Sequence, residues 1–306
     1  MENLTAIFFW GFLALYGITM TILSPKALTL GSFFKGEDKD GKKPSSFILT
    51  SSIFISWIFA KSVTNAANLG ADYGIVGGIA YATYWLCIPL AGFVIYRLRR
   101  KFKANGLVNF LSDNYGKTAA LAFSAAILIR LFNEVWSNSS VIGGYYGASG
   151  SGNFIIASSV FTIITLIYSG GLLSSLLIAK DLPNLKGIDL GNKSKIIGMS
   201  AMALFAIVGN LPMVFGINIL EATTISGTMV MGLAPIFLLH GFIKPTKIGF
   251  YLSFWIGIFL GIAYTMGIIP KVFAIGNGKS ALLLGVNLYG LVLCFLAYII
   301  PGLIKK

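Results

Sequence analysis

The chain has 306 residues, of which 56% are hydrophobic and only 11% are charged, and its formal net charge is +13. A soluble domain is usually about 45–50% apolar and about 25% charged, so this composition excludes an ordinary soluble fold. The positive charge does not indicate a nucleic-acid-binding protein, because the basic residues gather in short segments between apolar runs, where anionic lipid attracts them.

Long apolar runs predict an all-α, polytopic transmembrane helix bundle. A helix needs roughly 20 apolar residues to cross the hydrocarbon layer, and runs of that length give about nine spans. In chain order they are 4–24, 47–69, 75–97, 119–146, 154–179, 196–216, 223–242, 248–268 and 281–302. Transmembrane β-strands are excluded, because they are about ten residues long and alternate in polarity.

The basic residues favour every second connecting segment, and this alternation predicts the orientation of the bundle. Segments rich in Lys or Arg are 25–46, 97–117, 180–195 and 244–247, and the gaps without a base lie around Asp72, at 147–153 and at Glu221. Basic loops stay cytoplasmic, so we expect the N-terminus outside and the C-terminus inside. Lys271 and Lys279 depart from the alternation, because they lie in a gap expected outside.

We predict a single transmembrane domain over residues 1–306, because no polar stretch is long enough to bury a separate core. The most polar segment, 33–45, separates the first helix from the rest. The expected parts are a peripheral first helix at 1–24, early core helices at 47–185, a late helix group at 195–268 and a last span at 281–302. The expected location is the cytoplasmic (inner) membrane of a prokaryote or a plasma membrane, as an integral membrane protein.

Three ionisable residues lie well inside predicted spans, namely Lys61, Arg130 and Glu134. A charge at mid-depth costs at least about 2.5–3.5 kcal/mol on insertion scales, so such a residue faces a partner or a water-filled cavity. Arg130 and Glu134 are four residues apart and share one helix face. They are either a structural pair that neutralises itself or part of a site. Lys61 has no carboxylate in its own span, and we predict that it approaches the face of Arg130 and Glu134.

The second span is crowded with polar residues, which is unusual for a helix that faces lipid. Residues 51–74 read SSIFISWIFAKSVTNAANLGADYG. We predict a central, hydrated helix whose backbone is irregular between Asn65 and Gly70, as in transporters with a mid-membrane site. Pairing of its polar residues with neighbouring helices is the alternative.

Glycines with a four-residue spacing predict close packing of helices. The two pairs are Gly70 with Gly74 and Gly257 with Gly261. A further group of five glycines between 143 and 152 predicts an irregular, outward-facing turn.

Enzyme motifs are absent from the sequence, which has no Walker A, GxSxG or HExxH pattern. Cys87 and Cys294 lie inside apolar runs, have no metal-ligand neighbours and form no CxxC pattern. We therefore predict that the protein is not an enzyme and holds no organic cofactor.

Three segments, in this order, resemble the sodium/solute symporter family, which includes proline, sugar and urea permeases. The first is the polar helix at 51–74 with the basic turn RLRRKFKANGLVNFLSDNYG at 97–116. The second is YSGGLLSSLLIAKDLPN at 168–184. The third is TISGTMVMGLAPIFLLHGFIKPTKIGFYLSFWIGIFLGI at 224–262, where Lys244 and Gly249 match a Lys-x4-Gly loop of the family.

The resemblance implies part of a fold like that of the leucine transporter, which has two inverted five-helix repeats. It implies a secondary active transporter, with sodium-coupled symport of an amino acid, carboxylate or urea-like solute and sodium as the coupling ion. The expected substrate and ion site consists of Ile55, Ser56, Ile58, Ala60, Lys61, Asn65, Asn68, Arg130 and Glu134. Thr165 and Ser169 would offer hydroxyl ligands to sodium.

The alternative is an abbreviated relative that no longer transports and serves as a partner subunit, a sensor or a remnant. Compared with the sodium/solute symporters that it resembles, the chain is expected to lack several central helices. The expected partners are a small polar solute and the lipid bilayer, with no nucleic acid. A homo-oligomer would cover polar faces that the missing helices leave open.

Overall fold

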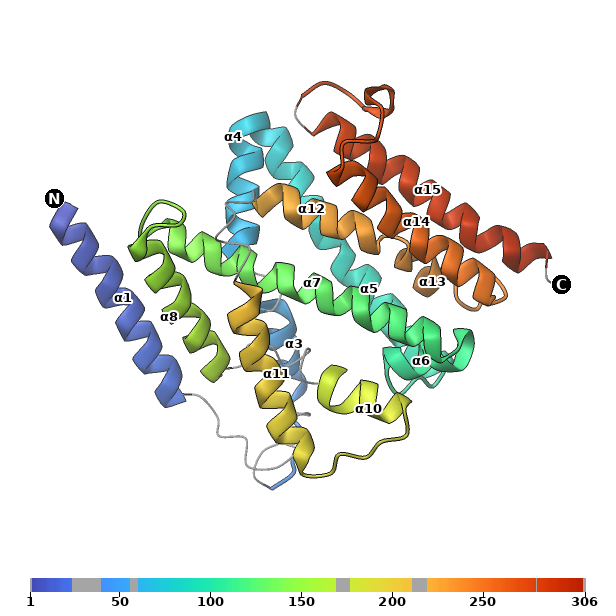
Figure 1. Cartoon of the computed structure of the whole chain (residues 1–306), viewed down its shortest axis with the longest axis horizontal. Helices are drawn as coiled ribbons and strands as arrows, with labels where there is room; N and C mark the ends of the chain where they lie inside the picture. Colours follow the sequence, from blue (N-terminus) through green and yellow to red (C-terminus); the bar gives the residue numbers. More distant parts are fainter. Residues whose placement is uncertain are drawn as a thin grey trace. The chain divides into compact units, whose positions relative to one another are not determined.

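The computed structural model describes residues 2–23, 40–55, 60–168, 177–210, 219–278 and 280–304 (Figure 1). These residues are mainly helical, and they contain no β-strand beyond one isolated bridge between His240 and Ile243. The expected all-α class is therefore confirmed for this part of the chain. The chain separates into two compact units, one formed by 1–85 and 131–219 and the other by 86–130 and 220–306.

The first unit is built from helices near the N-terminus and the middle of the chain. They are α1 (Glu2–Leu23), α3 (Ser46–Ile55), α4 (Ala60–Thr83), the later half of α7 (Lys117–Gly144), α8 (Gly152–Tyr168), η3 (Leu177–Asp181), α10 (Leu182–Leu185) and α11 (Lys193–Gly209). The helix α1 packs along α8, where Leu13 and Ile164 are buried together with Ala157.

The second unit contains the earlier half of α7 and the helices near the C-terminus. Its other elements are α5 (Cys87–Tyr96), η2 (Arg97–Lys101), α6 (Leu107–Tyr115), α12 (Ile219–Val230), α13 (Leu233–Leu238), α14 (Lys247–Thr265), η5 (Lys271–Phe273) and α15 (Ala281–Ile304). The short turn η1 (Tyr84–Leu86) leads into it. The long helices α14 and α15 pack on one another, and the hydroxyl oxygens of Tyr115 and Tyr298 lie 2.7 Å apart in the buried core of this unit.

Five described segments are long and apolar enough to cross a membrane. They are Thr5–Leu23, Ala60–Lys101, Lys117–Gly144, Lys247–Thr265 and Ala281–Ile304. Many large hydrophobic side chains on these segments are exposed, which would be unfavourable in water and suits a lipid environment. The structure is thus compatible with an integral membrane protein.

The 42-residue segment Ala60–Lys101 is interrupted by a reversal at Gly74. Gly74 has φ 62° and ψ −144°, a conformation that glycine adopts without steric cost. A Cβ atom added to Gly77 would lie 2.0 Å from the Leu69 carbonyl oxygen, so the chain folds back on itself here (Figure 1). The predicted irregular backbone between Asn65 and Gly70 is wrong, because these residues are continuous helix and the irregularity is at Gly74.

The two glycine pairs have different roles. Gly257 and Gly261 lie against α12 and the turn after it, because added Cβ atoms would meet Gly232 N at 2.9 Å and Met229 Cγ at 2.3 Å. The packing role predicted for this pair is therefore confirmed. Gly70 and Gly74 have no atom within 4 Å of an added Cβ, so this pair does not mediate a close helix contact among the described residues.

Candidate functional site

The structure joins α4 and α7 through an ion pair within the first unit. The Lys61 ammonium donates a hydrogen bond to Glu134 Oε2. The two side chains are 6% and 23% exposed, so the lysine is buried and the carboxylate retains limited access. The prediction that Lys61 approaches the helix face bearing Glu134 is confirmed.

Asn138 holds the start of α4 against the same face of α7. Its Oδ1 accepts the backbone N–H of Lys61 at 3.2 Å, and its Nδ2 donates to the Glu134 carbonyl at 2.8 Å. The first N–H groups of a helix have no partner within the helix, so Asn138 caps α4 from a neighbouring helix. Sequence reasoning missed Asn138, although its four-residue spacing from Glu134 places both on one face.

Asn65 lies one helical turn beyond Lys61 and therefore on the same face of α4. Its side chain is 3% exposed, and its Oδ1 has no hydrogen-bond partner among the residues that the structure describes. A buried amide oxygen without a hydrogen-bond donor is unfavourable. The Asn65 amide oxygen is thus a further hydrogen-bond acceptor on the face of α4 that carries Lys61.

The remaining residues of the expected site do not all gather here. Asn68 is exposed, and Ala60 is the half-buried first residue of α4. Arg130 lies on α7 one turn before Glu134, and its Nη1 donates to the Ser226 hydroxyl on α12. The side chain of Ile55 and all of Ser56, Ile58 and Ser169 lie outside the described residues.

A second polar cluster joins α7, α8 and the end of α11. The hydroxyls of Ser139 and Thr162 are 2.9 Å apart, and Asn210 Nδ2 donates to Thr162 Oγ1 at 2.9 Å. Ser158 Oγ donates to the Ser139 carbonyl at 3.1 Å. Sequence reasoning missed these four residues, because single Ser, Thr and Asn residues in apolar runs carry no motif.

Thr165, the residue expected to bind sodium, makes a local contact. Its hydroxyl donates to the Phe161 carbonyl of the preceding turn at 2.8 Å. The α8 hydroxyls that reach other helices include those of Ser158 and Thr162. Among the described residues, no group of three or more His, Cys, Asp or Glu side chains could hold a metal ion.

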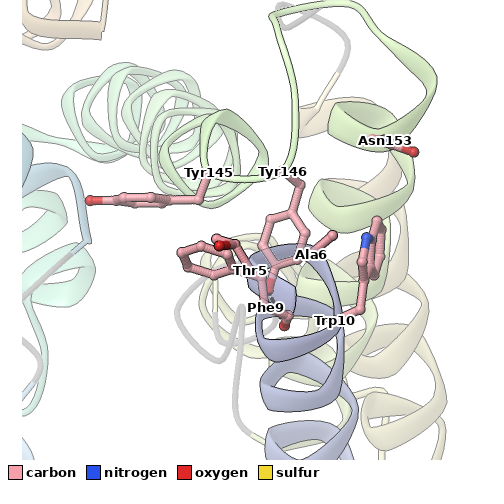
Figure 2. Close-up of a pocket in the computed structure, with 7 residues that line it drawn as sticks. All are labelled: Thr5, Ala6, Phe9, Trp10, Tyr145, Tyr146 and Asn153. Carbon is pink, nitrogen blue, oxygen red and sulfur yellow. Dashed lines mark hydrogen bonds between the residues drawn. The ribbon is translucent and has the colours of Figure 1, made fainter. Parts of the chain in front are cut away.

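Two cavities lie away from the ion pair. One of about 380 Å³ is lined by Thr5, Ala6, Phe9, Trp10, Tyr145, Tyr146 and Asn153, where the first turns of α1 meet the α7–α8 turn (Figure 2). In it the Tyr146 hydroxyl donates to the Phe9 carbonyl at 2.9 Å. The other is an apolar groove of about 420 Å³ along α14, beside Trp255 and Phe259. Neither is lined by Lys61 or Glu134.

The first unit therefore contains a buried polar contact in which an ammonium on α4 meets a carboxylate on α7. A carboxylate, an ammonium and an unpartnered amide oxygen can bind a small solute by charge and hydrogen bonding, whereas no nucleophile with an activating base is part of this group. Comparisons of the chain with protein-family models, with curated proteins and with solved structures found no match.

Proposed function

We propose that the protein is a secondary active transporter of a small polar solute. The observation that carries the proposal is the ion pair of Lys61 and Glu134 between two apolar helices. Ionisable residues within membrane-spanning segments are costly, and they mark substrate and ion pathways more often than structural contacts. The partial exposure of Glu134 supports access by a solute from one side of the pair.

Sodium-coupled symport is the form of transport that the resemblance to sodium/solute symporters supports. In this proposal the solute binds at the face of α4 that carries Lys61 and Asn65, opposite Glu134. The hydroxyls of Ser139 and Thr162 provide further polar groups between α7 and α8. The chain would be an abbreviated member of that family with part of a leucine-transporter-like fold.

The proposed topology has about nine spans, with the N-terminus outside and the C-terminus inside. The reversal at Gly74 supports counting Ala60–Lys101 as two spans. The alternation of basic and base-free segments supports the orientation.

Uptake into proteoliposomes tests the transport proposal. Labelled amino acids, carboxylates and urea are offered with and without an inward sodium gradient, and we expect accumulation of one class that depends on the gradient. The double variant Lys61→Met/Glu134→Gln, which keeps the site electrically neutral, should lose uptake. The exposed Lys193→Met should retain it as the control. Unchanged uptake in the double variant would place transport elsewhere in the protein.

A non-transporting membrane protein is the second candidate function, and one observation favours it. The Lys61 ammonium binds the Glu134 carboxylate, and Asn138 on α7 accepts a hydrogen bond from the backbone N–H of Lys61 on α4. Such a cluster can hold α4 on α7 without any solute. Absence of uptake for every solute class, combined with lower stability of variants that break the pair, would support this function over transport.

A further inference from the structure

We infer that one surface of the second unit binds the headgroups of anionic phospholipids in the cytoplasmic leaflet. This surface, the basic patch, consists of exposed bases from two segments that lie far apart in the chain. They are Arg99, Arg100, Lys101, Lys103 and Lys117 on the first segment and Lys244 and Lys247 on the second. The inference is independent of the proposed transport, because it concerns other residues and requires no solute.

Contacts between the two segments bring the bases of the patch together. Arg97 donates to the carbonyl oxygens of Leu238 and His240, at 3.2 and 2.7 Å, although Arg97 and Leu238 are 141 positions apart. Further along the first segment, a Cβ atom added to Gly116 would lie 3.5 Å from Lys247 Cε. The bases that precede α6 and α7 therefore share one surface with those that precede and begin α14.

The basic patch carries little negative charge of its own. Asp113 is the one acid within residues 97–117 and 241–247. No base of the patch forms an ion pair with a carboxylate among the described residues. An anion can therefore bind these side chains without displacing a carboxylate of the protein, and a cluster of bases of one sign attracts anions.

The position of the basic patch at the ends of apolar helices favours a lipid over a soluble anion. Three segments that could cross a membrane end or begin at its residues, namely Ala60–Lys101, Lys117–Gly144 and Lys247–Thr265. Bases at the ends of such segments lie at the depth of the lipid headgroups. Clusters of about four to eight Lys and Arg residues at this depth on the cytoplasmic side are typical of sites for anionic lipids.

Exposed apolar side chains beside the bases suit the acyl part of a phospholipid. Phe242 is 68% exposed, and the Arg97 guanidinium lies 4.2 Å from the centroid of its ring. Ile248, in the first turn of α14, is also exposed. A phospholipid offers a phosphate to the bases and an acyl chain to these side chains, whereas a soluble phosphate offers only the charge.

Native mass spectrometry of the full chain in detergent tests the inference. The probes are phosphatidylglycerol, which is anionic, and phosphatidylcholine with the same acyl chains, which has no net charge. We expect phosphatidylglycerol to bind at least about tenfold more tightly. Equal affinity for the two lipids would overturn the inference. Displacement of phosphatidylglycerol by millimolar inorganic phosphate would also overturn it, because the site would then recognise a free phosphate.

Two triple variants separate the basic patch from a general attraction between positive charge and lipid. Lys101→Gln/Lys244→Gln/Lys247→Gln changes the patch, and Lys43→Gln/Lys186→Gln/Lys193→Gln removes the same charge from exposed positions of the first unit. Each base near an anionic surface contributes roughly a factor of five in affinity, so the patch variant should bind phosphatidylglycerol on the order of a hundredfold more weakly. The control should retain its affinity, and an equal loss in both variants would contradict the patch.

Single changes keep the test decisive if the patch variant does not fold. Lys244→Gln and Lys247→Gln should each weaken the binding of phosphatidylglycerol about fivefold, and unchanged affinity in both would overturn the inference. Phe242→Ser keeps the charge and should weaken binding several-fold by removing an apolar contact. Phe273→Ser, at an exposed position on η5, is its control. Equal binding by these two variants would contradict the contact with the acyl chain.

Discussion

The Lys61 ammonium on α4 bonds to the Glu134 carboxylate on α7, although the two residues are 73 positions apart in the chain. Each charge would be unfavourable in an apolar interior without the other. The pair therefore fixes α4 against α7, and Asn138 adds a second contact by accepting a hydrogen bond from the backbone N–H of Lys61. Variants at these positions measure how much the contact contributes to stability.

Removing one charge should destabilise the protein more than removing both. Lys61→Met removes the ammonium that binds the Glu134 carboxylate. Loss of one partner from a buried pair costs about 3–5 kcal/mol, with the lower end expected here because Glu134 is partly exposed. Lys61→Met/Glu134→Gln should recover most of that loss. Thermal unfolding in detergent micelles measures all variants in one double-mutant cycle. Additive losses for the two single changes would show that the residues do not interact.

The reversal of α4 should depend on glycine at position 77. Gly77→Ala places a Cβ atom 2.0 Å from the Leu69 carbonyl oxygen, and relieving such a contact costs about 1–3 kcal/mol. Gly70→Ala is the matched control on the same helix, because its Cβ would have no neighbour within 4 Å. Thermal unfolding should show a lower melting temperature for the first variant and no decrease for the second. Similar melting temperatures would mean that the chain does not fold back at Gly74.

The hydroxyl of Thr162 should contribute more to stability than that of Thr165. Thr162→Val leaves Asn210 Nδ2 and Ser139 Oγ without their bonds to Thr162, and a buried polar group left unsatisfied costs about 1–3 kcal/mol. Thr165→Val removes only a bond within one turn of α8. Both variants have the same change in shape, so their difference in unfolding temperature reports the contacts between helices. A larger loss for Thr165→Val would contradict the cluster.

The proposed orientation predicts which side of the membrane each connecting segment faces. In a chain with Cys87→Ala and Cys294→Ala, we introduce Ser149→Cys in the α7–α8 turn or Lys244→Cys before α14. Both positions are exposed. A membrane-impermeant thiol reagent applied to intact cells should label the first variant and should label the second only after permeabilisation. The opposite pattern would reverse the orientation.

Sequence reasoning located the two charged residues and the helix face that joins them, because a charge in an apolar run stands out by its cost. It placed irregular backbone between Asn65 and Gly70, several residues before the reversal at Gly74. The glycine and asparagine content of this region permits a turn at several positions, and only the approach of Gly77 to Leu69 selects one.

The sequence alone and the tertiary structure determined different properties of this protein. Composition and the spacing of charges by themselves determined an apolar, helical chain with three ionisable residues inside its long runs, because hydropathy and charge are properties of each residue and its close neighbours. Only the tertiary structure decided that Lys61 meets Glu134, that Arg130 bonds to Ser226 and that Thr162 bonds to Asn210. Those contacts depend on how helices distant in the sequence pack. Many polar side chains in the chain could form such hydrogen bonds, and the packing determines which of them lie close enough to do so.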